Sequence, residues 1–183
     1  MSASQRAQIQ REMVASCVLG ILARTPDAVP QINIDDLCSE TGLGRNTVYG
    51  LFGSASRIVP ETLEGALAQF LAAALGDEAE ATPLGALERA AARWVGAALQ
   101  NVAVAQLLLR WQRPALAAAV AESLRRLLAR GIAAGAFAPD TLPQRLPYVA
   151  DVYLVALSEA NAPGASQRVL ARTLFDASLR LAR

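Results

Sequence analysis

The chain contains no histidine and no lysine, so all 17 of its basic residues are arginines. Without histidine, neither a Ser-His-Asp nor a Cys-His catalytic centre can form, and histidine-based metal sites are excluded too. Without lysine there is no Schiff-base chemistry and no phosphate-binding P-loop. Cys17 and Cys38, the two cysteines, are too few for a four-cysteine zinc site. We therefore expect no enzymatic activity, no metal site and no resident cofactor.

Acidic residues are dense at only two places, Asp35-Asp36 and the group Asp77, Glu78 and Glu80. Paired carboxylates can serve as acid and base in catalysis. Both groups, however, lie beside turn-like sequence, which indicates charges at a helix start or a solvated linker.

Long apolar segments are absent as well. The longest run without a charged residue has 16 residues, between Arg93 and Arg110, and it includes amide side chains. A membrane-spanning helix needs about 20 mostly apolar residues. Residues 1–11 are polar and lack the apolar core of a signal peptide. We expect a cytoplasmic protein that does not contact the membrane, with both cysteines reduced.

What the chain does contain favours helix. Of its 183 residues, 54% are hydrophobic but only 5% are aromatic, and alanine and leucine dominate. Both residues have high helix propensity. Turn signals divide the chain into about nine helices and leave no convincing strand, so we predict an all-α fold. The expected helices cover residues 4–24, 34–41, 45–52, a segment ending near 75, a segment beginning after 82, and residues 102–112, 115–134, 147–160 and 165–182.

Several helix ends carry specific signals. Asn33 is a natural N-cap, Thr82 followed by Pro83 is a cap with proline at the first helical position, and Gly135 suits the residue after a C-cap. Pro60 lacks an amide hydrogen, so we expect a bend or a delayed start in the fourth helix. Helical spacing predicts these apolar rows: Ile9, Met13, Cys17 and Ile21 in the first helix; Leu84, Leu87, Ala91, Trp94, Val95 and Ala98 in the fifth; Leu116, Val120, Leu124, Leu127 and Leu128 in the seventh.

One domain boundary is expected, near residue 54. Before it the helices are short and joined by tight turns, and after it they are long and rich in alanine and leucine. We predict a first domain over residues 1–54 and a second over residues 55–183.

Residues 33–59 carry the most specific pattern. A capped helix, a glycine-centred turn of about three residues and a second short helix have the helix-turn-helix spacing, in which the second helix can enter a DNA major groove. Arg45 can read guanine, Asn46 can read adenine, and Thr47 and Tyr49 can donate to phosphate. An ordinary helical hairpin with a glycine turn has the same spacing.

The same stretch resembles the TetR (tetracycline-repressor-like) family of transcriptional regulators. The match rests on Ile34, Leu37, Gly42, Leu43, Thr47, Val48, Tyr49, Phe52, Ser54 and Ile58, and on a turn late in the chain over residues 131–137. The resemblance implies a homodimer in which the first three helices bind operator DNA and the remaining helices hold a small-molecule effector. It also implies that the last two helices pair with their symmetry mates. The candidate DNA-binding set is then Asn33, Gly44, Arg45, Asn46, Thr47 and Tyr49.

Three departures from the family pattern concern DNA contacts. Ala55 stands where the family has lysine, Gly44 stands where it has serine, and Asn46 replaces a small residue. Residues 1–58 carry five arginines and five acids, so this region is formally neutral, whereas DNA affinity depends heavily on neutralising phosphates. The competing interpretation is a helical small-molecule-binding protein of the same fold with little or no DNA affinity.

The second domain offers candidate ligand and dimer residues. The candidate ligand-binding set is Phe70, Trp94, Trp111, Arg110 and Tyr148, whose aromatic members also suit ordinary core packing. In the last helix, Arg168, Arg172 and Asp176 recur at spacing four on one side. On another side lies an apolar row that suits either burial in its own domain or a dimer contact. We expect the two-fold interface to include Tyr153, Leu157, Leu170 and Leu174.

Overall fold

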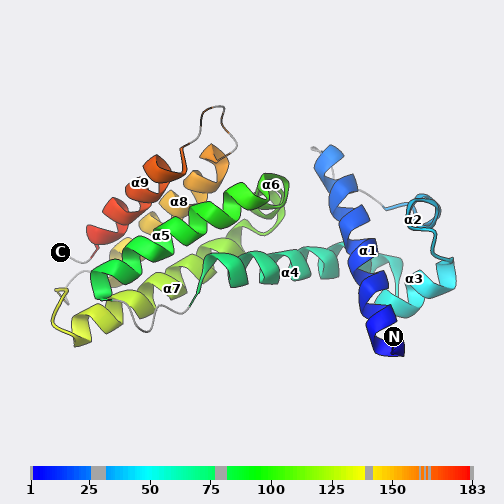
Figure 1. Cartoon of the computed structure of the whole chain (residues 1–183), viewed down its shortest axis with the longest axis horizontal. Coiled ribbons are helices and arrows are strands. Elements are labelled where there is room, and N and C mark those ends of the chain that lie inside the picture. The colour runs from blue at the N-terminus through cyan, green and yellow to red at the C-terminus, as the bar shows by residue number, and fades with distance from the viewer. Residues whose placement is uncertain are drawn as a thin grey trace. The chain divides into compact units, whose positions relative to one another are not determined.

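The protein is described here by a computed structural model that covers residues 2–25, 32–76, 82–138, 142–160, 162, 164 and 166–181, without the side chains of residues 142–144. Over these residues the chain forms nine α-helices and no strand (Figure 1). The predicted all-α fold is therefore confirmed. The helices are α1 (Ala3–Arg24), α2 (Ile34–Thr41), α3 (Arg45–Phe52), α4 (Ala55–Ala74), α5 (Pro83–Gln100), α6 (Val102–Trp111), α7 (Arg113–Ala133), α8 (Leu142–Glu159) and α9 (Gln167–Leu179).

Two compact units make up the chain, Met1–Ala66 and Leu67–Arg183. Their boundary falls inside α4, whereas the sequence suggested a boundary at residue 54, before that helix begins. The difference arises because the first half of α4 contributes Ile58 and Leu63 to the buried side chains of the first unit. Composition changes at residue 54, but packing continues for three more helical turns.

The first unit packs α1 against α2 and α3. The predicted apolar row of α1 is wrong by one residue, because Ile9 is 53% exposed and Met13 39% exposed. The buried row is Val14, Val18 and Leu22. Both rows repeat every four residues, so spacing alone cannot decide which row faces the neighbouring helices.

Most predicted helix ends agree with the structure. The side chain of Asn33 caps α2, and the side chain of Thr82 caps α5 ahead of Pro83. Gly135 follows the C-cap of α7 with φ of 69°, a left-handed conformation that glycine adopts without steric cost. These signals are local, and the local interactions form as predicted.

Proline positions account for the helix starts that differ. Pro60 predicted a bend or a delayed start in α4, and the delayed start is wrong, because the helix already begins at Ala55 with Pro60 inside it. Pro114 lies in the first turn of α7, where helix amides have no intrahelical acceptor, so α7 begins at Arg113. The helix α8 begins at Leu142, earlier than predicted, and contains Pro147 in its interior.

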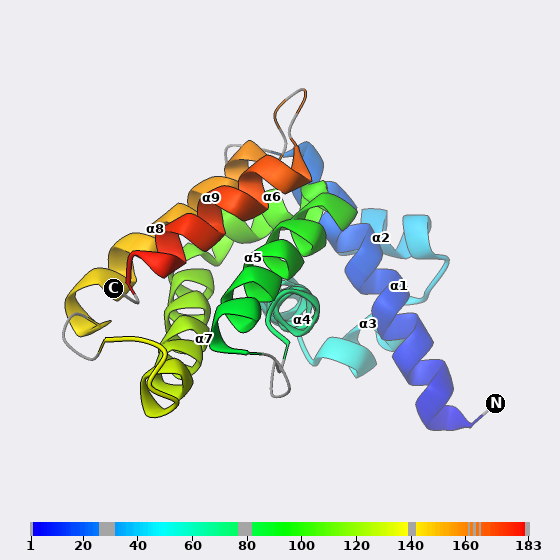
Figure 2. The same cartoon turned by 60° about the vertical axis from the view of Figure 1, so that its left-hand side comes forward.

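In the second unit α5 is central, because it contacts α6, α7, α8 and α9. The helices α8 and α9 run side by side, and α9 also lies along α5 (Figure 2). The predicted row of α7 is buried throughout, whereas Leu84 of α5 is 48% exposed.

A buried aromatic cluster joins three helices of this unit. The ring of Trp94 on α5 meets Phe70 of α4 and Tyr153 of α8 edge-on, at centroid distances of 5.3 and 5.7 Å. The indole Nε1 of Trp94 donates to the carbonyl of Tyr153 at 2.9 Å. The hydroxyl of Tyr153 pairs with that of Ser178 on α9 at 3.0 Å, and burial raises the pKa of Tyr153 to about 12. The cluster therefore ties α4, α5, α8 and α9 together with its polar atoms satisfied.

This packing corrects the expected two-fold interface. Tyr153, Leu157 and Leu174 are buried within their own chain, each no more than 1% exposed. They cannot form an outer surface. Leu170 is half-buried. The sequence left open whether the apolar row of the last helix is buried in its own domain or forms a dimer contact. The structure supports burial, because Leu174 and Leu181 of this row are no more than 1% exposed.

No helix in the described part of the chain is both long and apolar enough to cross a bilayer.

The aromatic cluster yields a stability prediction. Replacing Trp94 with alanine should lower the free energy of unfolding by about 3–5 kcal/mol, because it leaves a cavity and removes two ring contacts. Leu84→Ala, at an exposed position of the same helix, should change it by less than about 1 kcal/mol. Urea denaturation followed by circular dichroism measures both variants. Equal losses for the two variants would contradict the central role of Trp94.

Candidate nucleic-acid interface and surface grooves

The α2–turn–α3 segment is built from two capped helices and a glycine turn. The amide oxygen of Asn33 accepts from the backbone N–H of Asp35 at 3.0 Å, which fixes the start of α2. Gly42 ends α2 with φ of 68°, a conformation that disfavours any residue with a Cβ atom. Gly44 then caps α3 without a side-chain hydrogen bond.

The two faces of α3 differ sharply. Val48 and Phe52 are buried and, with Leu37 of α2, hold the hairpin together. Arg45, Asn46 and Tyr49 are exposed, and Thr47 is half-buried. The short helix therefore presents its polar first turns to solvent. Chemically, this arrangement offers a guanidinium, a carboxamide and two hydroxyls to a ligand with many acceptors.

The predicted DNA-binding residues do not all have the same role in the structure. Gly44, Arg45, Asn46, Thr47 and Tyr49 are brought together at the start of α3. Asn33 lies instead at the start of α2, where its side chain caps that helix.

Arg45 has a partner that the sequence did not reveal. Its Nε donates to Asp35 Oδ1 at 2.6 Å, and its Nη2 forms an ion pair with the same oxygen. The hydrogen bond to Asp35 raises the pKa of Arg45. In the sequence, Asp35 was interpreted only as a charge at the helix start. The ten-residue separation carries no local signal, because the contact depends on how the turn folds back.

The end of α3 is held by Arg11 of α1. Its guanidinium donates to the carbonyl of Leu51 and lies 5.2 Å from the ring centroid of Phe52. The same side chain is 3.8 Å from the carboxylate of Glu61 on α4. A single arginine thus connects the last turn of α3 to two neighbouring helices of the first unit.

Most positive charge in this unit is already paired. Arg24 meets Glu40 at 3.7 Å, Arg57 meets Glu61 at 2.5 Å, and Arg11 and Arg45 have the acidic partners given above. These pairs are largely exposed, so each contributes little to stability. The pairing also reduces the net positive charge of the unit, and so reduces its attraction for a polyanion.

Cys17 shows no sign of a reactive thiolate. Cys17 is half-buried and its thiol donates to Glu40 at 3.0 Å. Burial, and then the neighbouring carboxylate, raise the pKa of Cys17 to about 11. Cys38 is also free and half-buried. Among the described residues no group of three or more histidine, cysteine or acidic side chains is placed to hold a metal ion.

The predicted ligand-binding residues are scattered. Phe70 and Trp94 belong to the packed aromatic cluster and are less than 10% exposed. Trp111 is half-buried and Arg110 is exposed, both at the end of α6. Tyr148 is 74% exposed on α8 and borders a small hollow of about 290 Å³ between α8 and α9. Ligand binding by this set of residues therefore stays a prediction.

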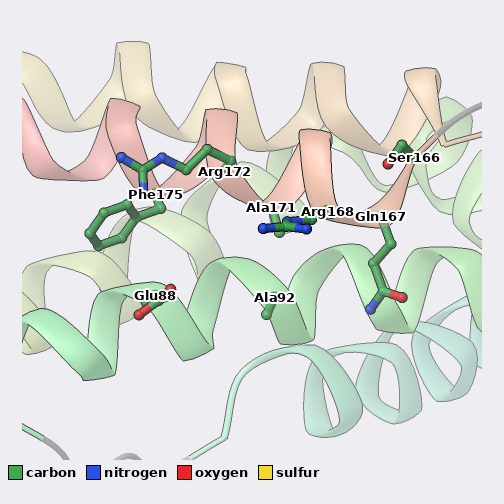
Figure 3. Close-up of a pocket in the computed structure, with 8 residues that line it drawn as sticks. All are labelled: Glu88, Ala92, Ser166, Gln167, Arg168, Ala171, Arg172 and Phe175. Atoms are coloured by element: carbon green, nitrogen blue, oxygen red, sulfur yellow. The ribbon is translucent and has the colours of Figure 1, made fainter.

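A larger groove, of about 710 Å³, lies between α5 and α9 (Figure 3). Glu88 and Ala92 come from α5, and the other wall is formed by Ser166, Gln167, Arg168, Ala171, Arg172 and Phe175. The guanidinium of Arg172 lies 5.3 Å from the ring centroid of Phe175, and its Nε is 3.1 Å from Asp176. Arg168 forms no ion pair within the described part of the chain.

The sequence contained a signal for this groove. Arg168 and Arg172 recur at spacing four in the last helix, which places both on one face. What the sequence could not show is that α5 lies opposite that face with Glu88 and Ala92. The groove combines the guanidinium of Arg168, the guanidinium of Arg172 over the Phe175 ring, and the carboxylate of Glu88.

Comparison with known proteins supports the fold. No protein-family model and no curated protein matches the chain. Among solved structures, the chain is similar to the crystal structure of RolR in complex with its ligand resorcinol, at 16% identity and a TM-score of 0.52. The match covers 98% of this chain and 96% of the RolR chain. At this identity the likeness establishes a shared fold over nearly the whole of both chains.

Proposed function

We propose that the chain is a TetR-like DNA-binding transcriptional regulator, a homodimeric repressor that a small-molecule effector releases from its operator. The observation that carries this proposal is the exposed polar start of α3. There Arg45, Asn46 and Tyr49 project from a helix whose opposite side is buried in a helix-turn-helix unit. The shared fold with RolR, whose structure contains its ligand resorcinol, supports the ligand-binding part of the proposal. Such a regulator would act in the cytoplasm, where its operator lies, and would catalyse no reaction.

The chemistry of α3 suits the DNA major groove. The guanidinium of Arg45 can donate to guanine O6 and N7, and the carboxamide of Asn46 can pair with adenine. Thr47 and Tyr49 can donate to phosphate oxygens and so fix the orientation of the helix. The first-turn amides of α3 meet no side-chain cap at Gly44, so a phosphate can accept from them.

The dimer would use a different face from the one expected. On α8, Tyr148 and Val155 are 74% and 52% exposed, with half-buried Val152 between them at helical spacing. On α9, Val169 is 62% exposed. Exposed apolar side chains grouped on one face are typical of protein interfaces. A two-fold interface there would leave the buried aromatic cluster intact.

The effector would bind in the groove between α5 and α9. A volume of about 710 Å³ lies within the range of small-molecule sites. Arg168 can pair with an acidic group, while Ala92, Ala171 and Phe175 can contact an apolar or aromatic body. We therefore propose an aromatic acid as the effector class.

One observation favours the second candidate, a helical small-molecule-binding protein with little DNA affinity. Four of the five arginines in residues 1–58 are paired with carboxylates, namely Arg11, Arg24, Arg45 and Arg57. Neutralising phosphates normally supplies most non-specific affinity. If this second function holds, the groove binds its ligand, and adding duplex DNA does not change the affinity for that ligand.

DNA reading is tested by substitutions in α3. Arg45→Ala and Asn46→Ala should each weaken binding to the specific site by about 1–3 kcal/mol, because each removes a bidentate base contact. Tyr49→Phe should weaken specific and unrelated duplexes alike, since it removes a phosphate donor. Fluorescence anisotropy with both duplexes measures the difference. Wild-type affinity in Arg45→Ala and Asn46→Ala would refute the assignment of these two residues.

The dimer face is tested by introducing charge. Val155→Arg should convert the protein to a monomer, because stable dimers bury apolar area that cannot accommodate an unpaired cation. Leu84→Arg is the matched control, since Leu84 is 48% exposed but lies on α5. Analytical ultracentrifugation at micromolar protein distinguishes the two species. A wild-type protein that sediments as a monomer would remove the dimer from the proposal.

The effector site is tested with benzoate as the probe and resorcinol, the ligand of RolR, as a comparison. Benzoate should bind more tightly, and Arg168→Ala should weaken its binding at least several-fold, whereas Arg110→Ala should not. If benzoate weakens DNA binding, thermodynamic linkage requires operator DNA to weaken benzoate binding by the same factor. We expect a coupling free energy of about 1–3 kcal/mol. Calorimetry with and without operator measures this coupling. Equal benzoate affinity in both conditions would rule out release by the effector.

A further inference from the structure

The contact between Arg45 and Asp35 uses one particular edge of the guanidinium. Nε donates to Asp35 Oδ1 at 2.6 Å, and Nη2 pairs with the same oxygen. Arginine has five N–H donors in a fixed planar fork. The pairing therefore leaves both Nη1 hydrogens and one Nη2 hydrogen available, along the outer edge of the group.

Asp35 is itself held in place. Its backbone N–H donates to the capping side chain of Asn33, and the next turn of α2 contains Leu37, which is fully buried. The carboxylate thus stands on a capped and packed helix. Both side chains are more than half exposed, 62% for Arg45 and 59% for Asp35. The backbone of Asp35, however, is held in place by the helix that carries it.

We propose that Asp35 is a positioning residue for base recognition, which holds Arg45 by its Nε edge so that the Nη1–Nη2 edge faces guanine O6 and N7. The inference rests on the proposed function and names a specificity determinant within the same site. The outer edge of the guanidinium matches the two guanine acceptors, which is the commonest specific contact of arginine. The negative charge of Asp35 also disfavours a phosphate at this position, so Arg45 is directed toward a base.

The alternative role for Asp35 is to neutralise Arg45. The two roles make different predictions for the loss of the carboxylate. A positioning residue sets the preference for guanine at one base pair, whereas a neutralising residue lowers affinity for every duplex without changing the preferred sequence.

The neighbouring acid provides a matched control. Asp36 also lies in the first turn of α2 and is exposed, but it has no ion pair in the described part of the chain. Asp35→Asn and Asp36→Asn therefore change the net charge and the helix-start charge equally, and only the former alters the contact with Arg45. Melting curves of both variants check that the unit remains folded.

The experiment is selection of binding sites by full-length protein from a pool of duplexes with a randomised core, followed by sequencing. Wild type should enrich a motif with a fixed guanine that Arg45→Ala loses. Asp35→Asn should reduce the preference for that guanine about fivefold or more, within the range that one bidentate contact supplies, while Asp36→Asn keeps it. An unchanged guanine preference in Asp35→Asn, or an equal loss in Asp36→Asn, would overturn the positioning role. If wild type enriches no motif, the proposed DNA-binding function fails and this inference fails with it.

Discussion

Pairing of arginine with carboxylates is the constraint that sets the charge and the contacts of α3 in the first unit. Because the chain has no lysine, the same arginines that position α3 also provide all the positive side-chain charge of the unit. Arg11 secures the end of α3 through the Leu51 carbonyl, the Phe52 ring and Glu61, and Asp35 holds Arg45 at the start of the same helix. The short helix α3 is thus fixed at both ends by charged groups. Little unpaired charge remains to attract a polyanion from a distance, so recognition would depend on close contacts made by a few side chains.

The second unit follows a different principle. Its centre is apolar and closely packed, with the aromatic rings of Trp94, Phe70 and Tyr153 in contact and their polar atoms satisfied. A groove lies at the surface of this unit, between α5 and α9. A ligand in a surface groove can shift a conformational equilibrium only if it binds one arrangement of the helices better than the other. The groove has the means for such selectivity, because its two charged walls belong to different helices.

The sequence predicted what local interactions determine. The nine helices, the caps at Asn33 and Thr82, and the glycine after α7 were all predictable, because each depends on residues close together in the chain. Three features were not. The buried row of α1 differs from the predicted row by one residue, Tyr153 is interior where an interface residue was expected, and Asp35 pairs with Arg45 across a turn. Each depends on which face of a helix meets its neighbour, and helical spacing alone does not determine that.

The salt dependence of DNA binding is the most direct test of the proposal that the chain binds DNA through a first unit whose positive charge is largely neutralised. Binding to the duplex upstream of the chain's own coding region would be titrated from low to physiological salt, with an unrelated duplex of equal length alongside. The slope of log K against log salt reports how many phosphates the protein neutralises, at about 0.9 per phosphate. The account predicts a preference for the upstream duplex that persists as salt rises, with a shallow slope. Equal binding of both duplexes with a steep slope, or no binding to either at low salt, would contradict it.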